Sequence, residues 1–347
     1  MTQLLTRDQF RERVFTRDTY LCVFCTLPAV DAHHILERRL WPDGGYYIDN
    51  GASVCQEHHL ACERTDITVE DVRQACGIEK PTLPPHLYND TRYDKWGNVI
   101  LDDGRRLAGE LFNDESVQKI LAQHLHEFVK YVKYPRTFHL PWSPGMHDDD
   151  RMMSDVNIFE GKQVIVMEKL DGENTTMYND YIHARSVTSG GHGSRDWIKA
   201  FHGRLCYNIP DGWRINVENV YATHSIKYTN LDTYGYGFAI WDETNHILDW
   251  NTTLEWFDLV GITPCSVIYW GVYDKNAIQA AYEAIKKDHE SEGYVIRVDG
   301  RFHMREFRNM VGKYVRKGHI QTTKHWMYGQ QIEPNELKPG LTGFEKI

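Results

Sequence analysis

The sequence predicts an α+β protein in which a small metal-bound module precedes a larger domain built on antiparallel sheets. Three observations lead to this prediction. The chain has 347 residues, and a chain of this length usually divides into two domains, each with its own hydrophobic core. Five of its seven cysteines lie before residue 80, among clustered histidines. From about residue 139 onward, short β-rich runs alternate with helical patterns.

Composition excludes several classes of protein. Apolar residues make up 41% and charged residues 25% of the chain, as in a soluble globular protein. The net charge of −10 argues against a generally basic nucleic-acid binder but leaves room for a local basic groove. No run approaches the ~18 apolar residues of a membrane span, and "MTQLLTRDQF" lacks the pattern of a signal peptide. We therefore expect a cytoplasmic protein without membrane contact.

Residues 1–79 form the first expected module, and their cysteines predict a zinc site. The uneven placement of the cysteines does not suit a disulfide framework. Cys22 and Cys25 of "CVFC" stand two residues apart, and Cys55 and His58 of "CQEH" repeat that spacing. Two such pairs suit tetrahedral Zn²⁺. Cys62 competes with His58 as the fourth ligand.

Residues 80–138 are predicted to be a connector that contains one helix. The stretch "EKPTLPPHLYNDTRYDKWGN" is rich in turn formers. After it, residues 114–134 carry apolar side chains near helical spacing, with Asp114 as the expected cap. These positions are Val117, Ile120, Leu121, Leu125, Phe128 and Val132.

Residues 139–347 are predicted to form the larger α+β domain. Strand-like runs occupy residues 163–170, 213–222, 236–242 and 292–299, and a helical pattern occupies 276–290. The first run, "QVIVMEKL", delivers Lys169 to a turn made by Asp171 and Gly172. A lysine attacks as a nucleophile only when it is deprotonated, and desolvation at the end of a strand favours that state. Lys169 is therefore the candidate nucleophile.

Further motifs follow "KLDG" in a fixed order: "HARS" at 183, "VENVYATHSIKY" at 217, "YGFAIWDE" at 236, "EGYVIRV" at 292 and "GKYVRK" at 312. This series resembles the nucleotidyltransferase motifs of ATP-dependent RNA ligases over about residues 135–335. The resemblance implies that Lys169 attacks the α-phosphate of ATP and forms a lysyl-AMP. The AMP then activates a 5′-phosphate end, and a 3′-hydroxyl displaces it to seal the strand.

The resemblance also implies roles for the residues that would bind ATP and metal. Asp171 and Gly172 would shape the turn and help hold metal or ribose. The other implied positions are Glu168 at the adenine edge, Arg185 at ribose or the 5′-phosphate, Glu218 at a ribose hydroxyl, Phe238 stacked on adenine, Glu292 at Mg²⁺ or Mn²⁺, and Lys313 at the α-phosphate. Trp241 competes with Phe238 for the stacking role.

Two features separate the sequence from related ligases. The family has two lysines separated by one residue in its last motif, whereas "GKYVRK" offers Lys313, Arg316 and Lys317. Either Arg316 or Lys317 could therefore take the role of the second lysine. The last ~25 residues show no OB-fold pattern, which a DNA ligase core normally carries. RNA is therefore the expected substrate, at nicks or 5′-phosphate ends, with the strand architecture and the oligomeric state left open.

The histidines of the first module resemble those of the HNH, or ββα-metal, nucleases. In "VDAHHI" and "DNGASVCQEHH", the resemblance implies His34 as general base, His33 and His59 as ligands of a divalent ion, and Asn50 as the residue that orients water. A neutral imidazole near pH 7 suits a general base. The alternative is a zinc module that only binds nucleic acid or supports the ligase.

Two other functions remain open from the sequence alone. The chain could be principally a nuclease whose ligase-like half has become a strand-binding platform. The ligase-like half could also adenylylate a protein instead of a strand end.

Overall fold

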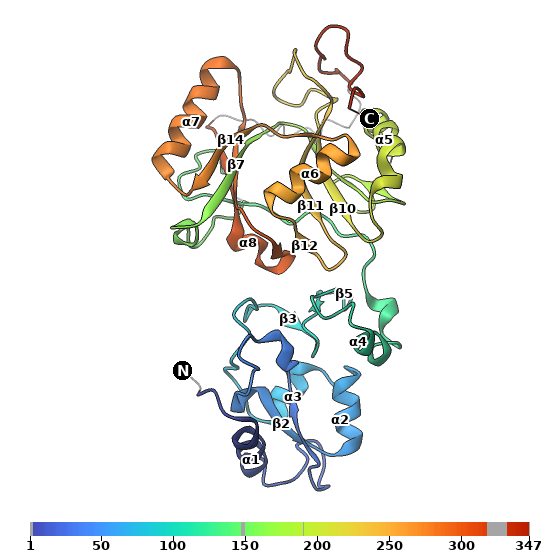
Figure 1. Ribbon diagram of the computed structural model, residues 1–347, viewed down its shortest axis with the longest axis vertical. Coiled ribbons are helices and arrows are strands. Elements are labelled where there is room, and N and C mark those ends of the chain that lie inside the picture. The colour runs from blue at the N-terminus through green and yellow to red at the C-terminus, as the bar shows by residue number, and fades with distance from the viewer. Residues whose placement is uncertain (1–2, 147–149, 190, 318–331, 347) are drawn as a thin grey trace. The chain divides into compact units, whose positions relative to one another are not determined.

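The protein is described here from a computed structural model that covers residues 3–146, 150–189, 191–317 and 332–346. The chain divides into two compact units, Met1–Lys130 and Tyr131–Ile347 (Figure 1). Helices and mostly antiparallel sheets occur in both, which confirms the α+β prediction. No helix in these described ranges is long and apolar enough to cross a membrane.

The first unit begins with three helices around a two-stranded antiparallel sheet. Helix α1 starts at a capping box, in which Thr6 and Gln9 each bond the other's backbone N–H. Its buried face, Phe10 and Val14, packs in one cluster with Leu5 and Ala32. The elements are α1 (Arg7–Arg17), β1 (Asp31–His34), β2 (Gly51–Val54), α2 (Gln56–Glu63) and α3 (Val69–Ala75).

Residues 80–130 also belong to the first unit. They contain a three-stranded antiparallel sheet and a short helix: β3 (Arg92–Tyr93), β4 (Val99–Ile100), β5 (Arg106–Leu107) and α4 (Glu115–Ile120). Asp114 caps α4 as predicted, because its carboxylate accepts from the backbone N–H groups of Ser116 and Val117.

The predicted helix over residues 114–134 is wrong in length. It stops at Ile120, and only a 3-10 turn, Leu125–Glu127, follows. Val117 and Leu121 are buried in a cluster with Trp96, and Ile120 and Phe128 pack against the same cluster. Leu125 is exposed, and Phe128 follows the 3-10 turn, with its ring centroid 4.4 Å from that of Phe112. Tertiary packing thus brings these apolar residues together without a continuous helix.

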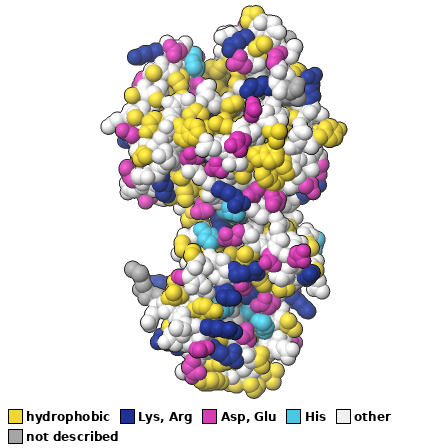
Figure 2. Space-filling model, in the orientation of Figure 1, with side chains coloured by type: hydrophobic (Ala, Val, Ile, Leu, Met, Phe, Trp, Pro, Cys, Tyr) yellow, Lys and Arg dark blue, Asp and Glu magenta, His cyan; other side chains and the backbone are white. Residues whose placement is uncertain are grey.

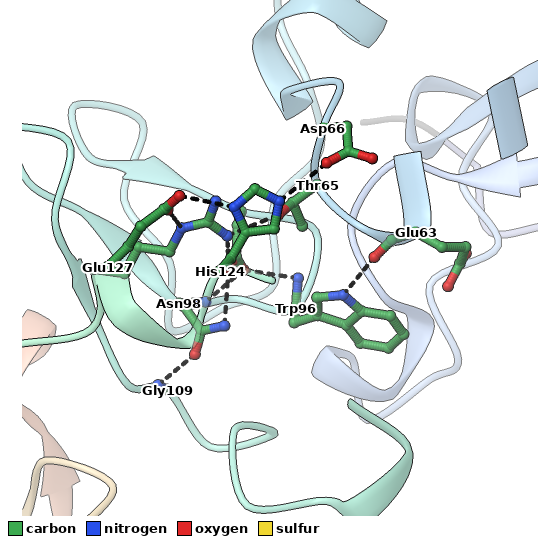
Figure 3. A network of polar contacts seen from close by, with 10 residues as sticks. Glu63, Thr65, Asp66, Trp96, Asn98, Gly109, His124 and Glu127 are labelled. Carbon is green, nitrogen blue, oxygen red and sulfur yellow. Dashed lines mark hydrogen bonds and ion pairs between the residues drawn. The ribbon is translucent and has the colours of Figure 1, made fainter. Parts of the chain in front are cut away.

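A buried polar network holds the 80–130 segment against the end of α2 (Figure 3). Arg106, whose side chain is 7% exposed, donates to Asp94 at 3.0 Å, to Thr65 at 2.8 Å and to Glu127 at 2.7 Å. His124 lies between Glu127 and Asp66 in Figure 3, at 2.7 and 3.0 Å. The network joins residues far apart in the sequence, with the ion pair of Arg106 and Asp94 buried and Glu127 and Asp66 partly exposed.

The second unit is built on two sheets. One has the order β16-β12-β11-β10-β8-β9, with β13 paired to β11; the other has the order β14-β7-β15-β17-β6. Their strands are β6 (Phe138–His139), β7 (Gln163–Lys169), β8 (Glu173–Met177), β9 (Ile182–His183), β10 (Arg214–Asn219), β11 (Gly235–Trp241), β12 (His246–Ile247), β13 (Thr263–Pro264), β14 (Val267–Val272), β15 (Gly293–Val298), β16 (Phe302–His303) and β17 (Val311–Val315). The four predicted strands and the helix at 276–290 are all present.

Helices cover the sheets of the second unit (Figure 1). They are α5 (Asp196–Leu205), α6 (Trp250–Val260), α7 (Lys275–Asp288) and α8 (Phe307–Met310). Buried residues of α7 pack on β7 and β15, and those of α5 and α6 pack on β8, β10 and β11. On the face shown in Figure 2, basic and acidic side chains are interspersed on both units.

The chain passes from one sheet to the other through the three residues between β7 and β8. Gly172 sits in this link, where an added Cβ would lie 2.6 Å from the carbonyl oxygen of Asn219. A larger residue would push the link away from β10. The sequence "KLDG" therefore stands where the two sheets meet.

We expect Arg106→Ala to destabilise the first unit by about 3 kcal/mol, because it leaves the buried Asp94 carboxylate without its cation. Denaturant unfolding of the full chain, followed with a probe in the first unit, measures this change. The neighbouring Arg105→Ala is the matched control, since Arg105 and Asp103 form an exposed pair that contributes little to stability. Equal effects of the two substitutions would contradict a structural role for the network.

Candidate active site

Lys169 at the end of β7 forms an ion pair with Glu292. Antiparallel pairing sets Lys169 opposite Gly293, the residue after Glu292, and Lys169 Nζ donates to Glu292 Oε2 at 2.6 Å. The lysine side chain is 25% exposed and that of the glutamate 4%. The amine is thus held at the edge of the protein interior, where a reactant can approach it.

The charges around Lys169 keep its amine protonated. Burial acts to lower the pKa of Lys169, but the nearby carboxylates of Glu292, Glu218 and Asp171 raise it above the usual value. A protonated amine cannot attack phosphorus. These carboxylates must therefore be neutralised before Lys169 can react.

Lys313 lies on the same face of the sheet as Lys169. In the ladder β7-β15-β17, Val295 pairs with both Met167 and Lys313, and alternate residues of a strand share a face. Burial, together with the charge of Lys169, lowers the pKa of Lys313, and Asp150 Oδ1 lies 3.4 Å from its Nζ. Lys169 and Lys313 thus lie on one face of this sheet, on two strands separated by β15, and their charges suit an anion bound over that face.

Glu218 approaches from the other sheet, on β10. Burial and the neighbouring carboxylates of Glu292 and Asp171 raise the pKa of Glu218 to about 8. Carboxylates crowded in this way favour either a proton or a cation. Their oxygen atoms are the donors that Mg²⁺ and Mn²⁺ prefer, so Glu218 and Glu292 fit a divalent ion.

Asp171 is anchored by the chain that follows β10. Its Oδ2 accepts from Ser225 N at 2.7 Å, Ser225 Oγ at 2.6 Å and Ile226 N at 2.8 Å, and its own N–H donates to Tyr228 Oη at 2.9 Å. These bonds hold the turn between β7 and β8. Asp171 therefore acts on the position of the neighbouring Lys169.

Phe238 is half-buried and meets Tyr134 edge to face, with ring centroids 5.2 Å apart. Trp241, the alternative stacking residue, is fully buried, and its indole N–H donates to Asn216. A ring without exposed area cannot stack on a nucleotide. Of the two aromatics, only Phe238 keeps a face for that role.

The remaining predicted ligase residues have other partners or are exposed. Glu168 points to the opposite face of β7 and accepts from His289 at 2.8 Å. Arg185 is exposed beyond β9, Arg316 pairs with Glu290, and Lys317 is exposed. Their predicted roles at adenine, ribose and phosphate stay predictions.

Sequence reasoning missed two groups near Lys169. His224 has neighbouring carboxylates in Asp171, Glu173 and Glu292, yet burial keeps its pKa below the usual value. Asp150 lies 3.1 Å from His139 and also faces Lys313. His224 lies within the motif "VENVYATHSIKY", which is the sequence signal that could identify it, whereas no local signal marks Asp150.

The predicted zinc ligands lie together in the first unit. The ligand atoms of Cys22, Cys25, Cys55 and His58 are all within 4.8 Å of one another. His58 Nδ1 is 3.5 Å from Cys22 Sγ and 3.1 Å from Cys55 Sγ, and the thiols of Cys25 and Cys55 are 3.9 Å apart. Tetrahedral zinc at about 2.3 Å from sulfur sets its ligands about 3.5–3.8 Å apart. The four residues fit Zn²⁺, and Cys62 is not in the cluster.

A second cluster joins His33 and His59 to Glu63, which sequence reasoning missed. Glu63 Oε1 lies 3.4 Å from both His33 Nδ1 and His59 Nε2. His59 and Glu63 are four residues apart on α2 and so share a face. His33 Nδ1 is buried and makes no hydrogen bond to any residue that the structure describes, so this cluster also fits a metal ion.

The two imidazoles of the second cluster differ in their pKa. Burial and Lys95 lower the pKa of His33 to about 3, which leaves a neutral imidazole, whereas the hydrogen bond to Glu63 raises the pKa of His59. Lys95 Nζ donates to the carbonyl of His34 at 2.8 Å and lies 3.0 Å from Glu63 Oε1. Neutral imidazoles and an ionised carboxylate are the forms that coordinate metals.

His34 and Asn50 differ from the arrangement expected of them. Successive residues of β1 face opposite sides, and His34 stacks on Phe10 at 4.5 Å, whereas His33 faces the cluster. The Asn50 amide accepts from Leu36 N and donates to the carbonyls of Leu36 and Gly45. Both N–H groups of the Asn50 amide are used in these bonds. Asn50 therefore holds the chain at Leu36 and Gly45 in place and has no donor left for a water.

Comparisons with known proteins support a ligase. A family model described as RNA ligase matches residues 162–315, which include Lys169, Glu218, Glu292 and Lys313. No curated protein matches the sequence. The match supports a ligase nucleotidyltransferase for this segment, an enzyme of the ATP-dependent RNA ligase type.

Solved structures of ligases are similar at low identity. An archaeal ATP-dependent RNA ligase is 14% identical, over 53% of this chain and 48% of its own, with a TM-score of 0.38. A Naegleria gruberi RNA ligase variant with ATP and Mn is 15% identical, over 55% and 57%, with a TM-score of 0.38. The same ligase with pyrophosphate is 16% identical, over 77% and 70%, again at 0.38. This chain spans about half the length of the first two, and TM-scores below 0.5 carry no argument about its function.

We expect about one tightly bound zinc per chain, because four ligands close one tetrahedral site. Elemental analysis of the purified protein after extensive dialysis measures it. Cys25→Ala should lose this zinc, whereas Cys62→Ala, which removes a nearby thiol outside the cluster, should retain it. Zinc that depends on Cys62, or no zinc at all, would show that the four-ligand site is wrong.

Proposed function

We propose that the second unit is an ATP-dependent RNA ligase that seals 5′-phosphate to 3′-hydroxyl ends through a lysyl-AMP on Lys169. One observation carries the proposal: Lys169 is held against Glu292, with Lys313 on the same face of its sheet and Glu218 on the facing sheet. The family match over residues 162–315 supports it. Such an enzyme would work on RNA in the cytoplasm, without membrane contact.

The first step joins Lys169 to AMP. The amine attacks the α-phosphorus of ATP; the N–P bond forms as the bond to the bridging oxygen breaks, and pyrophosphate leaves. The 2.6 Å hydrogen bond to Glu292 offers a path for the Nζ proton. Holding the amine in line with the leaving group supplies much of the rate of phosphoryl transfer.

Cations on the protein stabilise the charge that develops on phosphate. Lys313, on the same face as Lys169, would pair with the oxygens of the α-phosphate. Mg²⁺ or Mn²⁺ held by Glu292 would neutralise this carboxylate and the phosphate, which favours the deprotonated form of Lys169.

The nucleotide must be held without a P-loop, because the sequence has no G-x-x-x-x-G-K-[ST] motif. The exposed face of Phe238 would stack on adenine. Glu218 would bind the ribose and Glu168 the adenine edge, while Arg185 and Arg316 would pair with phosphate or ribose.

The later steps use the activated strand. The lysyl-AMP transfers its AMP to the 5′-phosphate of RNA, and the N–P bond breaks as a phosphoanhydride forms. A 3′-hydroxyl then attacks that 5′-phosphate and releases AMP. If AMP passes to a protein side chain instead, the label appears on protein and no RNA is joined.

We expect Lys169→Ala to abolish the covalent AMP adduct while ATP binding persists in part, since the stacking surface is unchanged. Lys169→Arg should also fail, because a guanidinium stays protonated. The measurement is acid-stable label on the chain after incubation with α-labelled ATP and Mg²⁺, then joining of a 5′-phosphate RNA. Lys162→Ala, at the other end of the same strand, is the matched control and should label normally. Persistent label on Lys169→Ala would identify another acceptor.

A second activity is favoured by a separate observation in the first unit. His33, His59 and Glu63 offer two imidazoles and a carboxylate to one divalent ion beside the zinc ligands. A structural zinc site does not need this second cluster. We propose that the first unit is a metal-dependent nuclease of the HNH type, in which His34 takes a proton from water and Asn50 holds the loop.

We expect metal-dependent cleavage of nucleic acid that is independent of ATP. Glu63→Gln should remove it by weakening metal binding, and His34→Ala should reduce it by roughly 10²- to 10⁴-fold if His34 is the base. Nicking of plasmid and labelled RNA with Mg²⁺ or Mn²⁺ measures the activity. Glu57→Gln, an exposed change on the same helix, is the control. If the wild type nicks neither DNA nor RNA, the first unit is a binding module.

A further inference from the structure

Residues 332–346 pack along the segment 220–234, which connects β10 to β11 and forms no strand of its own. Backbone bonds run from Thr223 N to Glu333 O at 2.8 Å, from Asn335 N to Tyr221 O at 2.8 Å and from Glu336 N to Tyr228 O at 2.9 Å. Backbone polar groups in proteins need partners. For the 220–234 segment, residues 333–338 supply many of them.

Asn335 is the centre of this contact and is 2% exposed. Its Oδ1 accepts from Tyr228 N at 2.8 Å and from Thr223 Oγ1 at 3.0 Å. Its Nδ2 donates to the carbonyls of Val220 at 2.8 Å and Ala222 at 3.4 Å. Both acceptor sites and both donors of the amide are thus used, all of them on the 220–234 segment.

The same segment holds the turn beside Lys169. Tyr228, whose backbone is bonded to Asn335 and Glu336, accepts through its Oη from the N–H of Asp171 at 2.9 Å. Ser225 and Ile226 donate three hydrogen bonds to the Asp171 carboxylate. The buried amide of Asn335 is therefore connected to the turn after Lys169 through one intervening residue, Tyr228.

We propose that Asn335 is a positioning residue for the reaction of Lys169 and acts through Tyr228 on Asp171. This inference rests on the proposed lysyl-AMP chemistry. Asn335 fixes the path of residues 220–228, these residues fix the Asp171 turn, and the turn fixes the Nζ of Lys169 relative to Glu292. Asn335 then supports the active site through Tyr228, without contacting Lys169 or Glu292 itself.

The effect of losing Asn335 follows from the geometry of attack. A reacting group displaced by about 1 Å can cost on the order of 10²-fold in rate. Asn335→Ala leaves Tyr228 N and the Val220 carbonyl without partners, so the segment shifts toward other bonds. Phe238 and Lys313 lie on other elements, so ATP affinity should change little.

The test is the single-turnover formation of lysyl-AMP with α-labelled ATP, measured for rate constant, amplitude and ATP dependence. For Asn335→Ala we expect the rate constant at saturating ATP to fall by about 10- to 100-fold, with the half-saturating ATP concentration and the amplitude near those of the wild type. Lys338→Ala is the matched control, because Lys338 lies on the same segment and its side chain pairs with Asp232 at the protein surface. It should leave the rate constant unchanged.

A double-mutant cycle tests the route. Tyr228→Phe removes only the hydroxyl that accepts from Asp171, and the loss it causes should not add to that of Asn335→Ala. Should Asn335→Ala fail to fold, Thr223→Val, which removes one bond to Oδ1, takes its place with a several-fold loss expected.

The outcomes separate this inference from the proposed function. A lower amplitude with an unchanged rate constant means that Asn335 only stabilises the fold, and additive losses in the cycle mean that it does not act through Tyr228; either result overturns the proposal. If the wild type forms no adduct, the proposed ligase function itself fails, and this inference falls with it.

Discussion

The ion pair between Lys169 and Glu292 is the constraint on which the second unit depends. A lysine at the end of a largely buried strand needs an anion within reach, because an unpaired charge there is costly. Glu292 provides it at 2.6 Å, and Asp171 adds negative charge nearby. The resting site is therefore stable but unreactive. Neutralising the carboxylates, by a divalent ion together with ATP, is what would free the amine to attack.

Holding these charges together requires that two sheets meet at one point. Lys169 ends β7 in one sheet, and only residues 170–172 separate it from β8 in the other. Such a short link is stiff only if its surroundings hold it. Gly172 allows the close approach to Asn219, and the 220–234 segment bonds the Asp171 carboxylate and N–H. Residues 332–346 in turn supply that segment with backbone partners.

The first unit uses other means to hold its structure. Its helices are short, and two groups of metal-ligand side chains lie around β1 and α2. A bound ion can supply folding energy that a small core lacks. The 80–130 segment is fastened by the buried Arg106 network instead of by a long helix. Charged groups and metal ligands thus do in this unit what apolar packing does around β7 and β15.

The sequence by itself determined the features that depend on near neighbours. The strand ending at Lys169, the helix now seen as Lys275–Asp288, the Asp114 cap and the Cys22, Cys25, Cys55 and His58 set all follow from local periodicity or spacing. The tertiary structure decided which distant groups meet: Glu292 lies 123 residues from Lys169, Asn335 lies 107 residues from Tyr228, and Glu63 joins His33 across β1 and α2. It also ended the predicted 114–134 helix at Ile120, and Phe128 joins the cluster of Val117 and Leu121 from beyond a 3-10 turn instead of from the same helix. Local propensity acts over a turn or a strand, whereas strand register and side-chain pairing are set by the packing of the whole unit.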